Sequence, residues 1–430
     1  MKLATKLLST YPALDRKAEM LEHLLADYPK RDFQVRFWDG FVWGTHPQSR
    51  FTLVLKSPRA LEAMYISPSE LSLGESYVRG DFEIEGDIEA ALDLGEHLLR
   101  QEHPIGKPSA LLKPLLRLAV HEKPPATVPF PELSGQLHSR HRDRRAVTYH
   151  YDIPSEFYAL WLDSRMVYSC AYFHAPDETL EAAQQNKLEY LCRKLRLRRG
   201  DRLLDIGCGW GSLVIHAAAA HGVQANGITL SEPQAEWARR QIHALGLDDR
   251  CRVEVRDYRD LDSAQPYDKI VSVGMFEHVG ESKLPEYFHH AWELLRPGGV
   301  FLNHGIAYSA TYHRRGPSFI DRYVFPDGEL VPINLSLRAA EETGFEVRDV
   351  ESLREHYALT LRHWLSRLES RSEEARRIAS DTTYRIYRIY LAGSAHAFRR
   401  ARLNVYQALL AKPTKGESGL PLTREDWYSD

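Results

Sequence analysis

Three glycines alternate in the run DIGCGWG, which directly follows a short apolar segment. Gly207, Gly209 and Gly211 allow a tight backbone turn and a close approach to a ligand, because glycine lacks a Cβ atom. The apolar residues predict a strand over 202–206, and a helix over 213–221 is expected to follow. A glycine-rich turn between such a strand and helix is typical of a nucleotide-binding crevice.

This run resembles the first motif of class I S-adenosylmethionine-dependent methyltransferases. Many of these enzymes carry an acid after the second strand to hold the ribose, but this chain has none there. Thr229, Ser231 or Gln234 is therefore expected to serve, and Asp257 suits the adenine amino group, with a simple helix cap as the alternative. The expected cofactor-binding positions are Tyr168, Ser169, Asp205, Gly207, Gly209, Gly211, Thr229, Leu230, Ser231, Gln234, Asp257 and Tyr258.

Strands and helices alternate over the second half of the chain. Strands are predicted at 202–206, 223–228, 251–255, 268–273 and 299–304, with further edge strands at 345–347 and 403–410. This alternation favours a doubly wound, mostly parallel sheet. The predicted fold class is α/β, a Rossmann-like class I methyltransferase with a seven-stranded sheet and a smaller N-terminal α+β domain.

A length of 430 residues suggests two domains. The predicted N-terminal α+β domain covers 1–118, with strands at 33–38, 51–55 and 80–87 and helices at 58–65 and 88–99. A Pro-rich and basic linker is expected over 119–146, and its HSRHRDRR cluster reads as a solvated connector rather than a headgroup-binding patch. The predicted catalytic domain covers 147–430.

Composition narrows the function further. A net charge of −3 and a single basic cluster argue against nucleic acid as a partner. The four cysteines form no CxxC pair, which favours a reducing cytoplasm, and no metal site is assigned. The N-terminus lacks the pattern of a secretory signal, and no segment is apolar enough to span a bilayer. If the substrate is a lipid, we expect a cytoplasmic protein that contacts the inner membrane surface transiently.

More specific motifs lie around the glycine turn. They are His150-Tyr151-Asp152, YSCAYF at 168–173, GITLSEPQ at 227–234, SVGMFEHVG at 272–280 and FLNHGI at 301–306. Together with the glycine turn, they resemble the cyclopropane fatty acid synthase family, which includes the mycolic acid cyclopropane synthases. The resemblance spans nearly all of 147–430. The N-terminal domain resembles the sterol-carrier-protein type of lipid-binding fold less closely.

The resemblance implies a reaction and a set of catalytic residues. A methyl group passes from S-adenosylmethionine to a cis double bond of a phospholipid acyl chain, and loss of a proton then closes a cyclopropane ring. The implied base is a bound bicarbonate, held by Cys170, Glu277, His304, Tyr357 and the backbone of Ile306. Histidine and tyrosine can donate hydrogen bonds to such an anion, and a glutamate can accept the bicarbonate proton.

Each of these side chains also has a purely structural interpretation. Cys170 suits a small core position, His304 a satisfied core histidine, and Tyr357 an apolar helical stripe. Glu277 is harder to explain in this way, because a carboxylate beside the expected crevice needs a partner. Ser394 occupies the position where family members often carry a cysteine, and a serine is a weak nucleophile without a base.

Other products and another protein class stay open at this point. The first alternative keeps methyl transfer but has another outcome: a methyl-branched or methylene chain, or a methylated small-molecule amine. The alternative of another class is a lipid-binding protein without catalysis. The N-terminal domain is expected either to dock the lipid or to build a homodimer, and the sequence does not choose between them.

Overall fold

The computed structural model describes residues 17–428 apart from 23–24, 45–47, 66–67, 101–127, 129, 132, 152 and 313–317. The chain divides into two compact units. The smaller comprises Met1–Phe130, Arg314–Val324 and Asp381–Gly393, and the larger comprises Pro131–His313, Phe325–Ser380 and Ser394–Asp430. The smaller unit therefore takes in two segments from far along the chain, beyond the N-terminal range expected from the sequence.

The smaller unit holds a four-stranded sheet in the order β2-β1-β3-β4. Its elements are β1 (Phe33–Arg36), β2 (Val42–Trp43), β3 (Phe51–Leu55), α3 (Arg59–Tyr65), α4 (Glu70–Arg79), β4 (Phe82–Gly86) and α5 (Ile88–Arg100). Strands β1 and β3 run parallel and alternate buried with half-buried residues, as the sequence predicts. Helix α4 was not predicted from the sequence.

Two buried arginines tie the distant helix α17 (Asp381–Arg399) into this unit. Arg385 donates to the Glu83 carboxylate at 2.6 Å, and Arg388 donates to the Tyr77 hydroxyl at 2.7 Å. Both guanidinium groups are almost fully buried, so these partners are needed to offset the loss of hydration. The second distant segment contributes α13 (Phe319–Tyr323).

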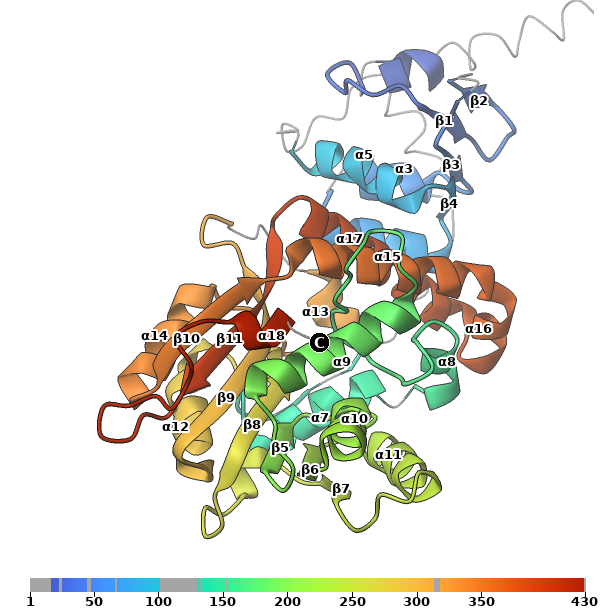
Figure 1. The fold of residues 1–430 in the computed structure, drawn as a ribbon. Coiled ribbons are helices and arrows are strands. Elements are labelled where there is room, and N and C mark those ends of the chain that lie inside the picture. Colours follow the sequence, from blue (N-terminus) through green and yellow to red (C-terminus); the bar gives the residue numbers. More distant parts are fainter. Residues whose placement is uncertain are drawn as a thin grey trace, which may run out of the picture. The chain divides into compact units, whose positions relative to one another are not determined.

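The larger unit contains a seven-stranded sheet in the order β10-β11-β9-β8-β5-β6-β7, seen side by side in Figure 1. The strands are β5 (Arg202–Ile206), β6 (Gln224–Thr229), β7 (Cys251–Val255), β8 (Tyr267–Val273), β9 (Leu295–Tyr308), β10 (Glu346–Ser352) and β11 (Leu403–Ala411). Strand β11 runs antiparallel to both of its neighbours. The doubly wound sheet predicted from the sequence is confirmed, with β9 longer than expected.

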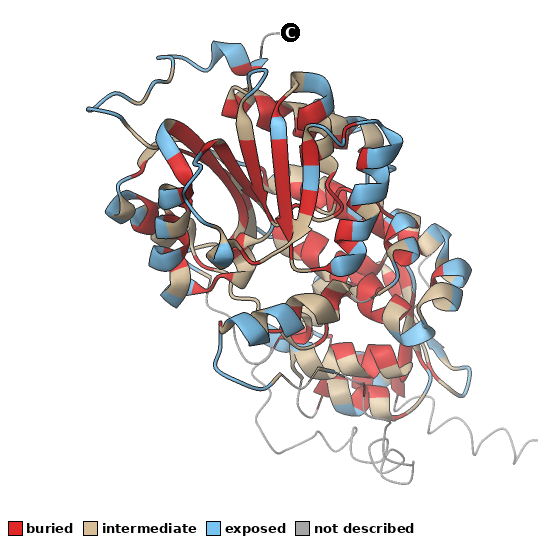
Figure 2. Cartoon of the chain, turned by 90° about the horizontal axis from the view of Figure 1, so that it is seen from below, coloured by how far each residue is buried: buried red, intermediate tan, exposed pale blue. Residues whose placement is uncertain are grey.

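Helices cover both faces of this sheet. The helices of the larger unit include α7 (Arg140–Tyr151), α8 (Ser155–Ala159), α9 (Leu180–Leu195), α10 (Ser212–His221), α11 (Glu232–Ala244), α12 (Leu284–Leu294), α14 (Ile333–Thr343), α15 (Arg354–Ser370), α16 (Ser372–Ile378) and α18 (Glu425–Tyr428). Leu203 packs with α9, α10 and α11, whereas Leu204 packs with α12 and α14, because successive strand residues face opposite ways. Figure 2 shows the strands as largely buried between these layers.

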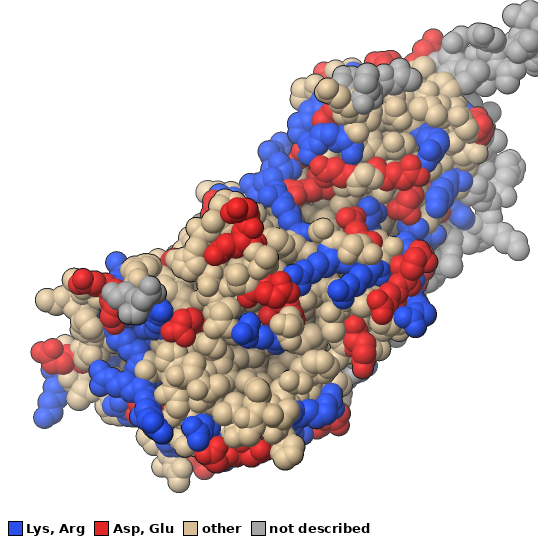
Figure 3. Space-filling model, turned by 45° about the vertical axis from the view of Figure 1, so that its right-hand side comes forward, with Lys and Arg blue, Asp and Glu red and all other residues tan. Residues whose placement is uncertain are grey.

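The expected linker is regular in its second half, where α7 begins at Arg140. The arginines of the basic cluster are also less free than a solvated connector implies. Arg140 pairs with Asp260 and Arg142 with Asp327, each at 2.6 Å. On the face drawn in Figure 3, basic and acidic side chains likewise lie interspersed rather than separated by sign.

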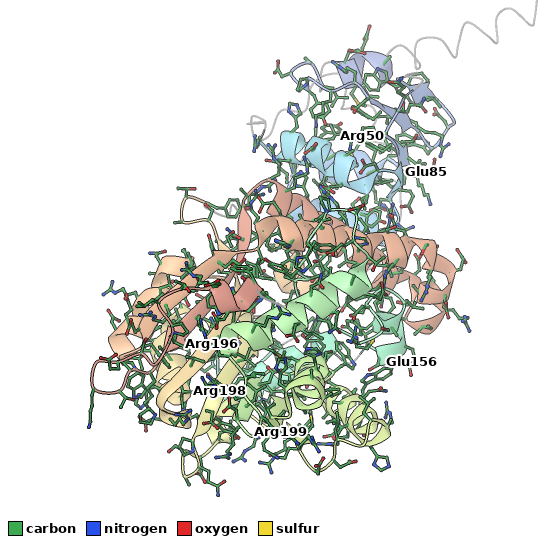
Figure 4. All side chains as sticks on the ribbon, in the orientation of Figure 1. Arg50, Glu85, Glu156, Arg196, Arg198 and Arg199 are labelled. Carbon is green, nitrogen blue, oxygen red and sulfur yellow. The ribbon has the colours of Figure 1, made fainter. Side chains whose placement is uncertain are left out.

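The C-terminal helix α18 is attached to the end of α9. Arg196, labelled in Figure 4, donates two hydrogen bonds to the Asp426 carboxylate, and its guanidinium lies 5.3 Å from the centre of the Trp427 ring. Such a paired and stacked arginine is a stronger contact than a single exposed ion pair. Among the described residues, none of the helices has the length and apolar character needed to cross a membrane.

Gly74 on α4 and Gly95 on α5 provide a test of packing in the smaller unit. A Cβ atom at Gly74 would lie 2.4 Å from the Phe319 ring, whereas one at Gly95 would meet nothing within 4 Å. We expect Gly74→Ala to destabilise the protein by about 1–3 kcal/mol through overpacking. Gly95→Ala should stabilise it by about 0.5–1 kcal/mol through helix propensity.

Thermal unfolding followed by circular dichroism measures both variants. Equal melting temperatures for the two variants would contradict the assignment of α13 to this unit.

Candidate functional site

The glycine turn after β5 adopts the backbone that its sequence predicts. Gly207, Gly209 and Gly211 have positive φ values of 85°, 54° and 82°. A Cβ atom at Gly207 would lie 2.7 Å from the side chain of Met275, and one at Gly211 would lie 2.8 Å from that of Ala238. Both glycines are therefore required by neighbouring side chains as well as by the turn.

A pocket opens where β5, β6, β7 and β8 end. Its lining includes these predicted positions: Tyr168, Ser169, Asp205, Gly207, Gly209, Thr229, Leu230, Gln234, Asp257 and Tyr258. The lining also holds side chains that the sequence analysis did not single out, among them Lys187, Trp210 and Met275. The predicted cofactor crevice is therefore assembled from segments between about 143 and 286 of the larger unit.

Gln234 is positioned for a ligand by the end of β6. Its Oε1 accepts a hydrogen bond from the Thr229 hydroxyl at 2.8 Å, which leaves the amide Nε2 on the side of Gly209. Ser231 has a different role, because its hydroxyl accepts from the Gln234 backbone N–H as the N-cap of α11. The pocket lining does not include Ser231 or Gly211, so these two predicted positions support the site from behind.

Asp257 combines the two interpretations that the sequence left open. It caps the 3₁₀ turn Tyr258–Asp260 and also lines the pocket. Both of its carboxylate oxygens accept from the Arg259 guanidinium, at 2.9 and 2.7 Å. Burial opposes ionisation, yet the hydrogen bonds from Arg259 lower the pKa of Asp257 below its usual value, so the carboxylate is charged.

Asp205 and Lys187 are an acidic and a basic residue that lie buried near each other in the pocket lining. Burial raises the pKa of Asp205 to about 7, and the nearby Lys187 ammonium opposes this rise. Burial likewise lowers the pKa of Lys187 to about 8. The Lys187 ammonium donates to the Ser169 hydroxyl at 2.9 Å, and Asp205 Oδ1 is buried without a hydrogen-bond partner. An unpaired buried carboxylate oxygen suits a cationic ligand group.

Lys187 was missed in the sequence, although a signal exists there. The apolar residues Leu180, Ala183 and Leu191 mark the buried face of α9. Lys187 falls on the same face, four residues from both Ala183 and Leu191, and it is almost fully buried. A lysine at a core position of an amphipathic helix requires a partner, which here is Ser169 beside Asp205.

Glu277 lies just after β8, at the edge of the sheet that carries the pocket. Its Oε1 accepts a hydrogen bond from the Ile306 backbone N–H at 2.7 Å. Its Oε2 is buried and has no hydrogen-bond partner. Burial raises the pKa of Glu277 to about 7, although the hydrogen bond from Ile306 opposes the rise. The Ile306 amide therefore holds the carboxylate, and Oε2 remains available to a ligand.

His304 lies two residues before Ile306 in β9 and pairs in register with Gln407 of β11. Its Nδ1 lies 3.2 Å from Gln407 Nε2. Burial lowers the pKa of His304 to about 3, so the imidazole is neutral. If the Gln407 amide donates to Nδ1, the ring proton is on Nε2, which can then donate to an anion. Gln407 was missed in the sequence, where a polar residue inside the apolar run VYQALLA was the available signal.

Cys170 and Tyr357 are brought to the same region by the backbone of Leu353. The Leu353 carbonyl accepts from the Cys170 thiol at 3.7 Å and from the Tyr357 amide at 3.0 Å. The Leu353 amide donates to Val405, which pairs in register with Ile306. Backbone contacts thus connect Cys170 and Tyr357 to the strand that carries His304 and holds Glu277.

Trp364 links this cluster to the cofactor pocket. Its ring centre lies 5.4 Å from that of Tyr168, which lines the pocket, and 6.0 Å from that of Tyr357. Aromatic rings beside both groups exclude water and offer their faces to a cation. Phe157 and Trp161 are fully buried and belong to this aromatic core.

Ser394 lies on α17, one helical turn before Phe398, whose ring centre is 4.7 Å from that of Tyr357. It is buried, and within the described part of the chain it makes no hydrogen bond to a histidine or a carboxylate. From the sequence, Ser394 is a catalytic candidate only through its position in the family, where a serine makes a covalent role doubtful. A hydroxyl without a neighbouring base is not activated as a nucleophile.

The chain matches the family model of mycolic acid cyclopropane synthetase over residues 138–408. It belongs to this family. Residues 20–97 match a second model, described as a domain of unknown function. These findings agree with the family resemblance and with the methyltransferase fold expected from the sequence.

Two relatives and one solved structure illustrate the relationship. The chain is 42% identical over 404 residues to a probable fatty acid methyltransferase of Pseudomonas putida, covering 92% of this chain and 96% of that protein. It is 36% identical to the cyclopropane-fatty-acyl-phospholipid synthase of Escherichia coli, covering 64% and 69%. The mycolic acid cyclopropane synthase CmaA1, solved with SAH and CTAB, aligns with a TM-score of 0.59 and 35% identity, covering 62% and 97%. The protein is an S-adenosylmethionine-dependent methyltransferase of this lipid-modifying family.

Gly207 and Gly200 allow the glycine turn to be tested with a matched control. They have nearly equal φ values, 85° and 87°, but a Cβ atom at Gly200 would meet nothing within 4 Å. Both alanine variants carry the same backbone strain, and only Gly207→Ala displaces Met275 in the pocket wall. We expect Gly207→Ala to weaken S-adenosylmethionine binding by tenfold or more relative to Gly200→Ala, as measured by calorimetry, and equal affinities would contradict this role.

Asp205 predicts how cofactor affinity depends on pH. Because the pKa of Asp205 is raised to about 7, its carboxyl is largely neutral at pH 6 and gains its charge as the pH rises through 7. The ammonium group of S-adenosylmethionine binds the charged form better. Affinity should therefore rise between pH 6 and 7.5, by at most about tenfold per pH unit.

Calorimetric titrations of the wild type and Asp205→Asn across this range provide the measurement. The variant should bind more weakly at pH 7.5 and lose the rise. A rise of the same size in the variant would assign the pH dependence to another group.

Proposed function

We propose that this enzyme converts cis double bonds of phospholipid acyl chains into cyclopropane rings. A methyl group would pass from S-adenosylmethionine to one alkene carbon, and a proton would then leave the added methyl group as the ring closes. The observation that carries this proposal is the Glu277 carboxylate, which has one oxygen held by Ile306 and the other buried and unpaired beside the cofactor crevice. Such a group equips the site for proton removal after methyl transfer.

Bicarbonate is the proposed base, and the residues present fit it. The unpaired Oε2 of Glu277 requires a polar partner, and a carboxyl with its pKa near 7 can exchange a proton with one. His304, Tyr357 and Cys170 would complete the anion's surroundings, with His304 donating from Nε2 when Gln407 fixes its tautomer. When bound, bicarbonate would supply the group that accepts the proton from the substrate.

The aromatic side chains have a second proposed task. An alkene attacked by a methyl cation equivalent becomes a carbocation, which water would capture at once, so the site must be dry. Tyr168, Trp161 and Trp364 form a packed aromatic group next to the pocket. Their ring faces can stabilise positive charge without offering a nucleophile.

Phospholipid is the proposed substrate class, by similarity to the Escherichia coli relative whose name specifies it. The acyl chain would be drawn from the membrane during transient contact with its inner surface, which makes the enzyme a cytoplasmic, peripheral membrane protein. The N-terminal unit would assist this contact or form a homodimer. A non-catalytic lipid-binding protein is disfavoured, because the glycine turn has the backbone of a cofactor-binding loop and Glu277 keeps a buried carboxylate oxygen without a partner.

A second product is supported by one specific observation. The match to the probable fatty acid methyltransferase covers 92% of this chain at 42% identity, whereas the match to the cyclopropane-fatty-acyl-phospholipid synthase covers 64% of this chain at 36% identity. The same cation would give a methyl-branched alkene if a proton leaves the acyl chain. It would give a methylene branch if a hydride first shifts from the methylated carbon to the cationic carbon and the new methyl group then loses the proton.

Glu277→Gln tests the proposed proton removal. The purified enzyme would be incubated with S-adenosylmethionine and liposomes of cis-unsaturated phospholipid, with and without bicarbonate, and the fatty acids analysed by gas chromatography and mass spectrometry. The wild type should give an acyl chain that is heavier by one CH₂ group and carries a cyclopropane ring. Glu277→Gln should lower the yield by about 100-fold or more while retaining S-adenosylmethionine binding.

Glu281→Gln is the matched control, because Glu281 lies four residues after Glu277 in the chain and is exposed. It should keep wild-type activity. A methylene or methyl-branched product would favour the second product. Full activity of Glu277→Gln would overturn the proposed role of this carboxylate.

A further inference from the structure

Helices α9 and α10 pack against each other (Figure 1), and four side chains with metal-binding atoms converge between them. Glu189 and Cys192 come from α9, and His216 and His221 come from α10. Glu189 Oε2 lies 3.1 Å from Nε2 of His216 and 3.1 Å from Nε2 of His221. Cys192 Sγ and one nitrogen of each histidine all lie within 4.8 Å of one another. The proposed function uses none of these residues.

We propose that Glu189, Cys192, His216 and His221 form a binding site for a divalent transition-metal ion, with Zn²⁺ as the best match. One thiolate, two imidazoles and one carboxylate are all ligand types that Zn²⁺ accepts in tetrahedral sites. Hard ions such as Mg²⁺ and Ca²⁺ prefer sets of oxygen ligands, which this cluster lacks.

The distances are close to those that a tetrahedral site requires. With metal–ligand bonds of about 2.0–2.3 Å, neighbouring ligand atoms lie about 3.3–3.7 Å apart. The two oxygen–nitrogen separations of 3.1 Å already fall near this range. The sulfur and the two nitrogens, which lie within 4.8 Å of one another, would need at most about 1 Å of side-chain movement.

The surroundings also suit a metal site. Arg193 donates to Glu189 Oε1 at 3.1 Å, which orients the carboxylate and leaves Oε2 toward the histidines. Ligating carboxylates commonly have such an outer partner. The side chains of His216 and His221 are 11% and 21% exposed, which gives an ion access from solvent, whereas Cys192 closes the site from the core.

Binding requires one proton to leave. The S–H bond of Cys192 breaks, a metal–sulfur bond forms, and the proton passes to water or buffer. The histidines would bind in their neutral forms. Four protein ligands leave no open position, so this site would be structural rather than catalytic.

The consequence for the enzyme follows from what the two helices carry. Helix α10 begins directly after Gly211 of the cofactor turn, and α9 carries Lys187, which supports Ser169 in the pocket. A metal ion that clamps α9 to α10 would hold the frame of the cofactor pocket without touching the reacting groups.

Hydrogen bonding alone gives a simpler account of part of this cluster. Two histidines that donate to one carboxylate explain Glu189, His216 and His221, but they do not explain a thiol within reach of both imidazoles. The buried sulfur is therefore the feature that points to a metal, and it also provides the spectroscopic signal for a test.

The test uses the full-length protein without a histidine tag, reduced and stripped with a chelator. Titration with Co²⁺ alone should give a sulfur-to-cobalt charge-transfer band and strong visible bands, as expected for a tetrahedral thiolate site. Added Zn²⁺ should displace the cobalt, remove the bands and raise the melting temperature. Absence of saturable Co²⁺ and Zn²⁺ binding at one ion per chain would overturn the proposal.

Two variants locate the bound ion. Cys192→Ala should lose the charge-transfer band. His221→Gln, at the partly exposed end of α10, should keep the fold and weaken Zn²⁺ binding on the order of 100-fold. The matched controls are Cys251→Ala, which removes another buried cysteine, and His243→Gln, which removes a histidine of α11 that contacts Asp248.

Both controls should bind like the wild type. If Cys192→Ala does not fold, His221→Gln decides the question alone, and unchanged affinity in that variant would overturn the site.

Discussion

One hydrogen bond, from the Ile306 amide to the Glu277 carboxylate, joins the segment that follows β8 to strand β9 in the catalytic region. It depends on the parallel pairing of β8 with β9, in which Val273 lies opposite His304. The chain leaving β8 therefore runs beside the next residues of β9. Gly305 permits this approach, because a Cβ atom there would lie 2.9 Å from the Phe276 ring. The carboxylate that the chemistry needs is thus fixed by backbone geometry rather than by a flexible side-chain contact.

Buried ionisable groups along the carboxyl edge of the sheet divide the work of the site. In the cofactor pocket, Asp205 and Lys187 each change the other's pKa. In the catalytic region, the Ile306 amide holds Glu277 and the Gln407 side chain contacts His304. Burial raises the pKa of the two acids and lowers the pKa of the two bases, and both changes favour the neutral form. Burial favours the neutral forms of Glu277 and His304, and surroundings of this kind next to aromatic rings suit a reaction in which positive charge develops on a hydrocarbon.

The strand β11 gives this sheet its specific character. It enters antiparallel between β9 and β10, so residues from the end of the chain reach the centre of the catalytic region. Gln407 faces His304 in this way. The Val405 carbonyl accepts a hydrogen bond from the amide of Leu353, which lies four residues before Tyr357. The proposed chemistry therefore depends in part on the contact of His304 with Gln407, two residues that lie 103 positions apart in the chain.

The sequence by itself determined the positions of the main strands along the chain, the position of the glycine turn and the family. These features depend on local properties: apolar runs bounded by glycine and proline, and residues that tolerate positive φ. Only the tertiary structure decided the partners of Lys187 and Gln407, the helical course of α7 and the grouping of Asp381–Gly393 of α17 with the smaller unit.

The cluster of Glu189, Cys192, His216 and His221 belongs with these tertiary features, because its spacing matches no familiar metal-binding pattern. In each of these cases, the stabilising partner comes from a distant segment. Strand register and helix packing select that partner, and neither can be read from local composition.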